Sequence, residues 1–109
     1  MNVDRPIALP AGAVPGEWET DRQLTYRILR GAPRGIASRP DVSVTASAIQ
    51  LDDGRVDSGA AIEPPRVFLE AGSDGLTVTQ ALRLASTLVE AVEELERWRA
   101  NPNRTATLA

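Results

Sequence analysis

The chain of 109 residues contains no cysteine, no histidine and no lysine. The lack of cysteine excludes disulfides, thiolate nucleophiles and thiolate metal sites. The lack of histidine removes the usual imidazole base and the commonest metal ligand. Serine and threonine are plentiful, but neither histidine nor lysine is available to activate one as a nucleophile. The composition therefore predicts a protein that is not an enzyme and that binds no cofactor.

Aromatic residues are also scarce, because Trp18, Tyr26, Phe68 and Trp98 are the whole set. The core must therefore be small and mostly aliphatic. Hydrophobic residues make up 42% of the chain and charged residues 25%, which is typical of a globular protein. No apolar run approaches the roughly 20 residues of a membrane span, and none near the N-terminus resembles a signal peptide. We expect a single cytoplasmic domain that does not bind membranes.

Alternating polar and apolar residues predict several β-strands. The alternation begins at Leu24 and continues to Leu29, then a loop rich in glycine and proline follows over residues 30–40. The pattern resumes at Val42 and slips near Ile49, where a bulge would restore the register. Two further strands are expected at residues 55–62 and 66–70.

The last predicted element is a long helix that begins after Thr77. The sequence TVTQ fits a capping box formed by Thr77 and Gln80. Apolar residues then recur three and four positions apart as far as Trp98, on a helix of about six turns. Asn101 and Pro102 are expected to end it.

These elements predict an α+β fold, in which one long C-terminal amphipathic helix packs on one face of a small antiparallel β-meander of three or four strands. Residues 17–100 form the expected domain. Residues 1–16, rich in proline, glycine and alanine, are expected to be a flexible arm, and residues 101–109 a flexible tail.

Asp52, Asp53 and Asp57 lie close together in the stretch LDDGRVDSG. A calcium loop of the EF-hand type needs oxygen ligands at positions 1, 3 and 5, glycine at 6 and glutamate at 12, and neither possible register satisfies this pattern. In contrast, Asp53-Gly54 between two β-like segments is typical of a hairpin turn. The stretch is therefore predicted to turn the chain and to bind no metal.

Five arginines lie between Asp21 and Asp41 with no acidic residue among them, and this segment carries +5 in a chain of net charge −3. They are Arg22, Arg27, Arg30, Arg34 and Arg39. Such a segment can bind phosphate groups of a nucleic acid. The favoured alternative is a solvated face, or an internal match to the acidic helix residues Glu90, Glu93, Glu94 and Glu96.

The apolar residues of the predicted helix spread over more than one of its sides, which is more than a small sheet can cover. An uncovered apolar strip usually marks a protein interface, and the simplest partner is the same helix of a second copy. The expected interface, anchored by Trp98, comprises Leu84, Leu88, Val92, Leu95 and Trp98.

From Thr45 onward the chain resembles a group of small uncharacterised actinobacterial and actinophage proteins. The stretches that carry this resemblance are TASAIQLDDGRVDSG, EPPRVFL and LTVTQALRLASTLVEAVEELERW. Proteins of this group often have proline after the capping threonine, where this chain has Val78. The resemblance implies an accessory protein of a mycobacterium-like host or of its phage, and it implies no activity.

The expected function is that of a small non-catalytic interaction protein, a phage or accessory factor that binds a host protein, itself, or both. The alternative is a nucleic-acid-binding regulator that uses the arginines of residues 22–39.

Overall fold

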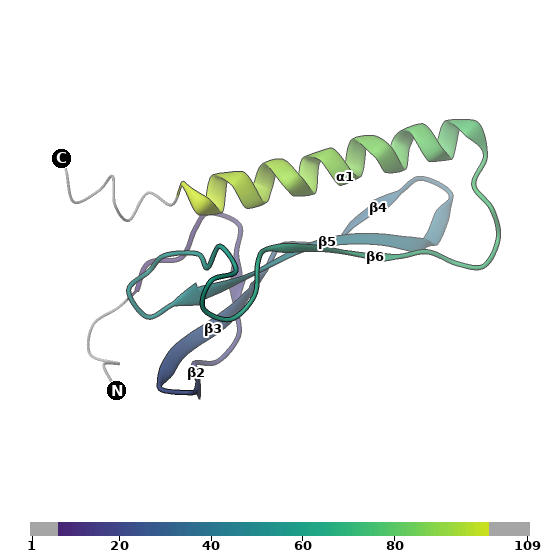
Figure 1. The fold of residues 1–109 in the computed structure, drawn as a ribbon. Helices are drawn as coiled ribbons and strands as arrows, with labels where there is room; N and C mark the ends of the chain where they lie inside the picture. Colours follow the sequence, from purple (N-terminus) through teal and green to yellow (C-terminus); the bar gives the residue numbers. More distant parts are fainter. Residues whose placement is uncertain (1–6, 101–109) are drawn as a thin grey trace.

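In a computed structural model, which describes residues 7–100, the chain forms an antiparallel sheet with one long helix packed against it (Figure 1). The predicted α+β class is confirmed. The strands are β1 (Val14–Pro15), β2 (Glu19–Asp21), β3 (Leu24–Arg30), β4 (Arg34–Ile36), β5 (Arg39–Leu51) and β6 (Arg66–Glu70), and the helix is α1 (Val78–Arg99).

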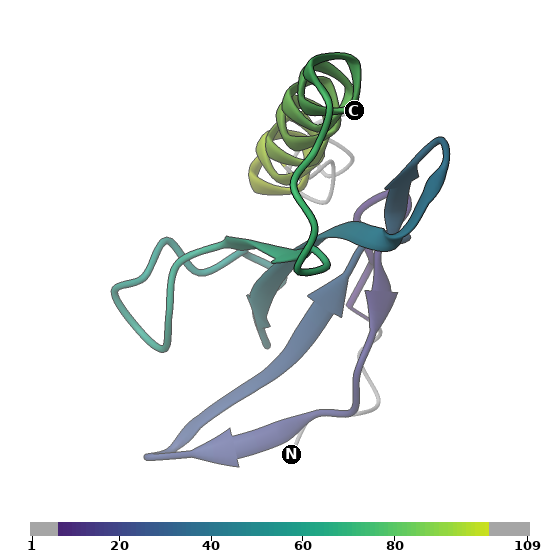
Figure 2. The same cartoon turned by 90° about the vertical axis from the view of Figure 1, so that its right-hand side faces the viewer.

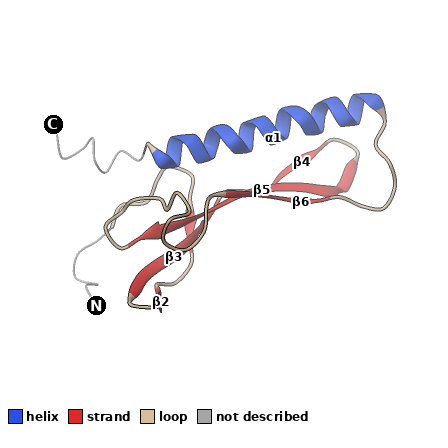
Figure 3. Ribbon diagram, in the orientation of Figure 1, coloured by secondary structure: helices blue, strands red, loops and turns tan. Residues whose placement is uncertain are grey.

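The long strand β5 lies at the centre of the sheet. One of its edges pairs with β3 and then with β4, and its other edge pairs with β6. Strands β1 and β2 pair with the outer edge of β3. The sheet is therefore a meander four strands wide, with β1 and β2 at one edge, then β3 and β4, then β5, and β6 at the other edge. Figure 3 shows the strands in one layer beneath the helix.

Strand β5 forms because its alternating small apolar residues fit a pleated surface that is covered on one face. Val42, Val44, Ala46 and Ala48 are all buried, as their alternation predicts. The core also contains Leu29 of β3 and Ala91, Leu95 and Trp98 of α1. Alanine at the centre of β5 leaves room for the indole of Trp98, which is only 1% exposed.

The expected bulge near Ile49 is not present. The ladder between β3 and β5 keeps one register from Arg30–Ser47 to Tyr26–Leu51, and the irregularity lies instead between Gly35 and Ile36. Ile49 is buried although it lies on the opposite face from Ala48. Both faces of β5 are therefore covered at this end, which is why the alternation of the sequence breaks down there.

The predicted loop over residues 30–40 contains β4, and β5 begins within it at Arg39. Ser38 has a φ of 69° in the tight connection between the two strands. The predicted strand at 55–62 is reduced to a single bridge between Val56 and Gln50. The strand at 66–70 and the helix cap are confirmed, because β6 spans these residues and Thr77 forms the capping box with Gln80.

Residues 7–16, expected to belong to a flexible arm, lie against the domain. Pro10 is fully buried, and the Ala11 carbonyl accepts a hydrogen bond of 3.2 Å from the indole N–H of Trp98. The folded domain therefore extends to residue 7. Residues 1–6, the expected tail at 101–109 and the expected helix stop at Asn101 and Pro102 lie outside the described residues.

Candidate interaction surface

The five arginines singled out in the sequence do not form one basic surface. Arg22 and Arg30 are exposed, whereas the other three are held by intramolecular contacts at separate places. Each of these three fastens a different pair of segments. The segment is therefore built mainly to hold the fold together, as the favoured interpretation of its charge predicts.

Arg27, on β3, is 9% exposed. Its Nε donates to Gln50 Oε1 at 2.8 Å, and its Nη2 donates to the Ile7 carbonyl at 3.0 Å. The guanidinium also lies 4.4 Å from the centre of the Trp18 ring, where a cation–π attraction stabilises it. Burial lowers the pKa of Arg27, but arginine stays charged at any physiological pH. These contacts fasten the N-terminal segment to the sheet.

Arg34, on β4, forms ion pairs with the helix. Its Nη1 lies 2.8 Å from Glu94 Oε1, and its Nε lies 3.6 Å from Glu90 Oε1. Glu94 is only 6% exposed, and a Cβ at Gly31 would lie 2.5 Å from its Oε1. Glycine at position 31 is therefore needed for the carboxylate to fit. The predicted match between the arginine segment and the acidic helix is confirmed for this residue.

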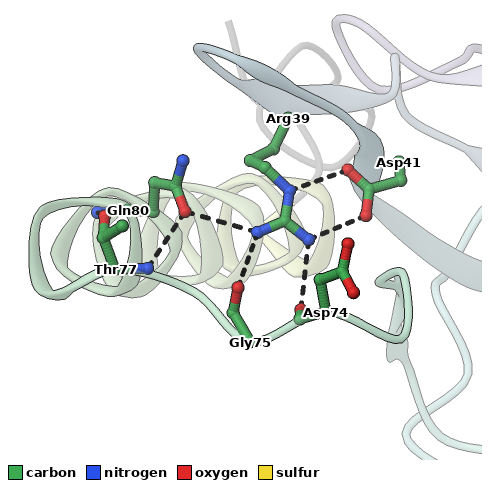
Figure 4. A network of polar contacts seen from close by, with 6 residues as sticks. All are labelled: Arg39, Asp41, Asp74, Gly75, Thr77 and Gln80. Carbon is green, nitrogen blue, oxygen red and sulfur yellow. Dashed lines mark hydrogen bonds and ion pairs between the residues drawn. The ribbon is translucent and has the colours of Figure 1, made fainter.

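Arg39, at the start of β5, joins the sheet to the loop before the helix (Figure 4). Its Nε and Nη2 donate to the two carboxylate oxygens of Asp41 at 2.9 and 2.8 Å. The remaining donors reach the carbonyls of Asp74 and Gly75 and the side chain of Gln80, which also closes the capping box. The guanidinium thus donates five hydrogen bonds, to Asp41, Gln80 and the two loop carbonyls. None of its N–H groups is therefore available to a phosphate.

The hydrogen bonds from Arg39 lower the pKa of Asp41 to about 2, although burial opposes the shift. Burial likewise works to raise the pKa of Asp57, but the backbone N–H groups of Gly59, Ile62, Ala61 and Glu63 outweigh it and hold this pKa below its usual value. Both carboxylates are therefore more acidic in the folded protein than in the unfolded chain. Their ionised forms stabilise the fold.

Acid should remove this stabilisation. A carboxylate whose pKa is lowered by folding contributes fully to the free energy of unfolding when the pH is above its pKa in the unfolded chain, near 3.8. This contribution is lost as the pH falls towards the pKa of the folded state. We expect the free energy of unfolding, measured with urea, to fall between pH 4 and pH 2. The Asp41→Asn variant should start lower at pH 7 and lose less over this interval. An identical loss in Asp41→Asn and in the natural chain would contradict the assigned role of Asp41.

The aspartates of LDDGRVDSG have different roles. Gly54, with a φ of 94°, donates to the Leu51 carbonyl at 2.9 Å, so Asp53-Gly54 turns the chain as predicted. Asp53 forms an exposed ion pair with Arg55. Asp57 is buried, and its two oxygens accept four backbone hydrogen bonds of 2.5–3.1 Å. Across residues 7–100, no cluster of three or more acidic residues is placed to hold a metal ion.

The bonds to Asp57 also explain why residues 55–62 do not form the predicted strand. A side-chain carboxylate that binds the backbone N–H groups of residues 59, 61, 62 and 63 competes with the hydrogen bonds of a sheet. After Val56 the chain therefore curls around Asp57 and returns to the sheet only at Arg66.

The predicted interface on the helix needs a correction. Leu95 and Trp98 are 6% and 1% exposed and belong to the protein's own core, and Leu84 and Leu88 are partly buried against that core. Of the five predicted residues, Val92 alone is exposed, at 48%. Trp98 cannot anchor a partner, because β5 and the N-terminal segment already cover it. The sheet covers more of the C-terminal half of the helix than the sequence suggests.

A different row of apolar residues on α1 faces solvent. Val78, Leu82, Val89 and Val92 are 80%, 67%, 56% and 48% exposed, and Ala85, between them, is also exposed. Their spacing of four, three, four and three residues places them in one line along the helix, which is the pattern of a coiled-coil seam. We call these five residues the helix stripe. The interface predicted from the sequence missed most of them because it followed the apolar face that contains Leu84, Leu88, Leu95 and Trp98.

The helix stripe reaches the β6 side of α1 at Val92, whereas Leu82 and Val89 lie on the side of the helix turned away from the buried Ala91. Arg34 of β4 contacts Glu90 and Glu94 on the opposite flank of the helix. On the β6 side, a groove of about 370 Å³ separates the helix from the sheet, lined by Ser58, Pro65, Val67, Val92, Leu95, Glu96 and Arg99. Figure 2 shows the helix above the sheet, with the β4–β5 hairpin on one side and the loop that precedes β6 on the other.

Strand β6 adds two more exposed apolar side chains, Phe68 at 48% and Leu69 at 49%. Leu69 lies opposite Val44, which belongs to the core beneath the helix, so Leu69 is on the helix side of the sheet and Phe68 is on the other side. The groove connects the helix stripe to β6, because Val92 of the stripe and Val67 of β6 both line it; we call the helix stripe, the groove and β6 together the α1–β6 flank.

No protein-family model, no curated protein and no solved structure matches the chain. Among the residues that the structure describes, no helix is both long and apolar enough to cross a membrane.

Proposed function

We propose that the chain is a small non-catalytic interaction protein that associates with itself through the α1–β6 flank. The observation that carries this proposal is the helix stripe, in which four apolar side chains are 48–80% exposed along one line. Isolated exposed apolar residues are ordinary on protein surfaces, but a contiguous apolar strip usually marks a binding surface. The spacing of the stripe suits a second helix or a second apolar surface.

Three features support a binding role over a catalytic one. The chain lacks histidine, cysteine and lysine. The buried carboxylates Asp57 and Glu94 are occupied by backbone N–H groups and by Arg34. The two charged residues that line the groove beside the stripe, Glu96 and Arg99, pair with each other at 3.0 Å.

The nucleic-acid alternative receives less support. Arg27, Arg34 and Arg39 are committed to intramolecular contacts, so only Arg22 and Arg30 of the five remain exposed. Two cations on a protein of net charge −3 are a weak basis for binding phosphates. The accessory role in an actinobacterium or its phage, with a host protein as a further partner, rests on the sequence resemblance. The cytoplasm remains the proposed compartment, since the chain has no cysteine.

Light scattering over micromolar concentrations tests self-association. We expect a mass of twice the 11.7 kDa of one chain. Leu82→Glu and Val89→Glu should each raise the dimer dissociation constant by about tenfold or more, because they place carboxylates in an apolar interface. Both side chains are exposed in the protomer, so its melting temperature should change little.

Thr79→Glu is the matched control, since it adds the same charge to the same helix away from the helix stripe. This variant should associate like the natural chain. A mass of one chain at every concentration would contradict the proposal, and so would equal dissociation constants for Leu82→Glu, Val89→Glu and Thr79→Glu.

A further inference from the structure

Strand β6 is an edge strand whose sequence, Arg66-Val67-Phe68-Leu69-Glu70, is complementary to itself when reversed. In an antiparallel pair of two such strands centred on Phe68, Arg66 lies opposite Glu70 of the second copy, and Val67 lies opposite Leu69. Phe68 then lies opposite Phe68. Opposite charges meet at both ends and apolar residues meet in the middle, which is the arrangement that stabilises cross-strand pairs.

The backbone of β6 is also oriented for such pairing. Gly31 N–H donates to the Ala46 carbonyl, so the polar backbone groups of Ala46 point towards β3 and β4. These groups alternate in direction along an antiparallel strand, so those of Thr45 and Ser47 point towards β6. Thr45 lies opposite Phe68, and Ser47 lies opposite Arg66.

It follows that Phe68 and Arg66 use their backbone groups within the sheet, and that Val67 and Leu69 turn theirs to the free edge of β6. In the reversed pair, Val67 and Leu69 of the two copies face each other. They are the residues whose N–H and C=O groups are available to exchange hydrogen bonds. The register that places Arg66 opposite Glu70 of the second copy is therefore also the register in which the free backbone groups of Val67 and Leu69 face each other.

We propose that a second copy of this chain binds along β6, in the antiparallel register centred on Phe68, and that the two sheets become one continuous sheet. This proposal rests on the self-association proposed above and assigns its geometry. The twofold axis passes beside Phe68. The twofold axis is perpendicular to the joined sheet, so the two helices lie on the same face of it, and Val92 of each helix stripe lies beside the groove next to β6.

Edge strands that display apolar side chains without a partner promote uncontrolled aggregation, and proteins usually cover or charge such edges. Here Phe68 and Leu69 are half exposed on the edge, and the flanking charges have opposite signs. Two like charges would repel a second copy, whereas Arg66 and Glu70 attract it in one register only. The pairing thus protects the edge and selects a closed dimer.

Disulfide trapping tests the register directly, because the chain contains no cysteine of its own. In Phe68→Cys the two introduced residues form a non-hydrogen-bonded pair, with Cα atoms about 4.5 Å apart, within the range of a disulfide. We expect Phe68→Cys to form a covalent dimer under mild oxidation. Glu70→Cys is the control, since its two copies lie about 13 Å apart, which is beyond disulfide reach.

Two further variants test the pairing without cross-linking. Leu69→Pro removes an outward N–H that the protomer does not use, a position where edge strands accept proline. We expect it to abolish the dimer and to leave a folded protomer, whereas Leu69→Thr, which keeps the N–H, should weaken the dimer much less. Arg66→Glu and Glu70→Arg should each raise the dissociation constant about tenfold, and the double variant should restore it to within about threefold.

Arg66 also lies 3.8 Å from Glu63 within the protomer. The double variant does not restore this contact, so recovery in it reports the pairing between copies. A natural chain that is monomeric at all concentrations would overturn both this inference and the proposed self-association. A dimer that survives Leu69→Pro, or in which Glu70→Cys cross-links as readily as Phe68→Cys, would overturn the pairing of β6 and leave self-association through the helix stripe standing.

Discussion

Replacing Trp98 by alanine should destabilise the protomer by about 3–5 kcal/mol, the usual cost of removing a large aromatic side chain from a core. The side chain is 1% exposed and packs among Leu29, Ala46 and Leu95. Its removal also leaves the Ala11 carbonyl without the indole donor. The total stability of a small domain is about 5–15 kcal/mol. The variant should therefore melt about 20 °C lower, which calorimetry or circular dichroism will measure.

Two matched substitutions separate the causes of this loss. Trp98→Phe keeps most of the apolar volume and loses the hydrogen bond to Ala11, so it should cost about 1–2 kcal/mol. Leu82→Ala removes a side chain that is 67% exposed and should cost less than about 0.5 kcal/mol. A melting temperature of Trp98→Ala within about 5 °C of the natural value would show that the tryptophan is not in the core.

Replacing Asp57 by alanine should cost about 2–4 kcal/mol. Four backbone N–H groups, of residues 59, 61, 62 and 63, lose their acceptor at once, and each unsatisfied group costs about 1–3 kcal/mol where water cannot replace the bond. The loop rearranges to expose some of them, which reduces the sum. Urea unfolding at pH 7 measures the loss.

Asp57→Asn should cost about half as much as Asp57→Ala, because the amide keeps one acceptor oxygen and turns a donor towards the remaining N–H groups. Asp53→Ala is the control within the same stretch. Its carboxylate forms an exposed ion pair with Arg55, so the loss should stay below about 1 kcal/mol. Equal losses for the alanine variants of Asp57 and Asp53 would contradict the role assigned to Asp57.

Several elements could be predicted because their signals are local. The helix begins at Thr77 since the threonine and Gln80 satisfy each other's backbone groups, and this depends on four consecutive residues. The turn at Asp53-Gly54 depends on one glycine with a positive φ. The burial of Val42, Val44, Ala46 and Ala48 follows from alternation along one strand.

The errors arose where a distant segment supplied the partner. The strand predicted at 55–62 was lost because Asp57 is buried and takes the N–H groups that a sheet would use. The predicted interface at Leu95 and Trp98 was wrong because residues near Ala11, 87 positions away from Trp98, cover that end of the helix. Neither event leaves a periodic signal in the sequence.

The sequence by itself determined the fold class, the position and cap of the helix, the central strand and the exclusion of cysteine and histidine chemistry. Each of these depends on residue type or on neighbours within a few positions. Only the tertiary structure decided which apolar side of α1 is buried and which arginines are engaged. The helix has apolar residues on two sides; the side with Ala91, Leu95 and Trp98 packs on β5, and Arg34 and Arg39 connect the helix to the sheet. This packing leaves the apolar side chains of the helix stripe and of the β6 edge exposed to solvent.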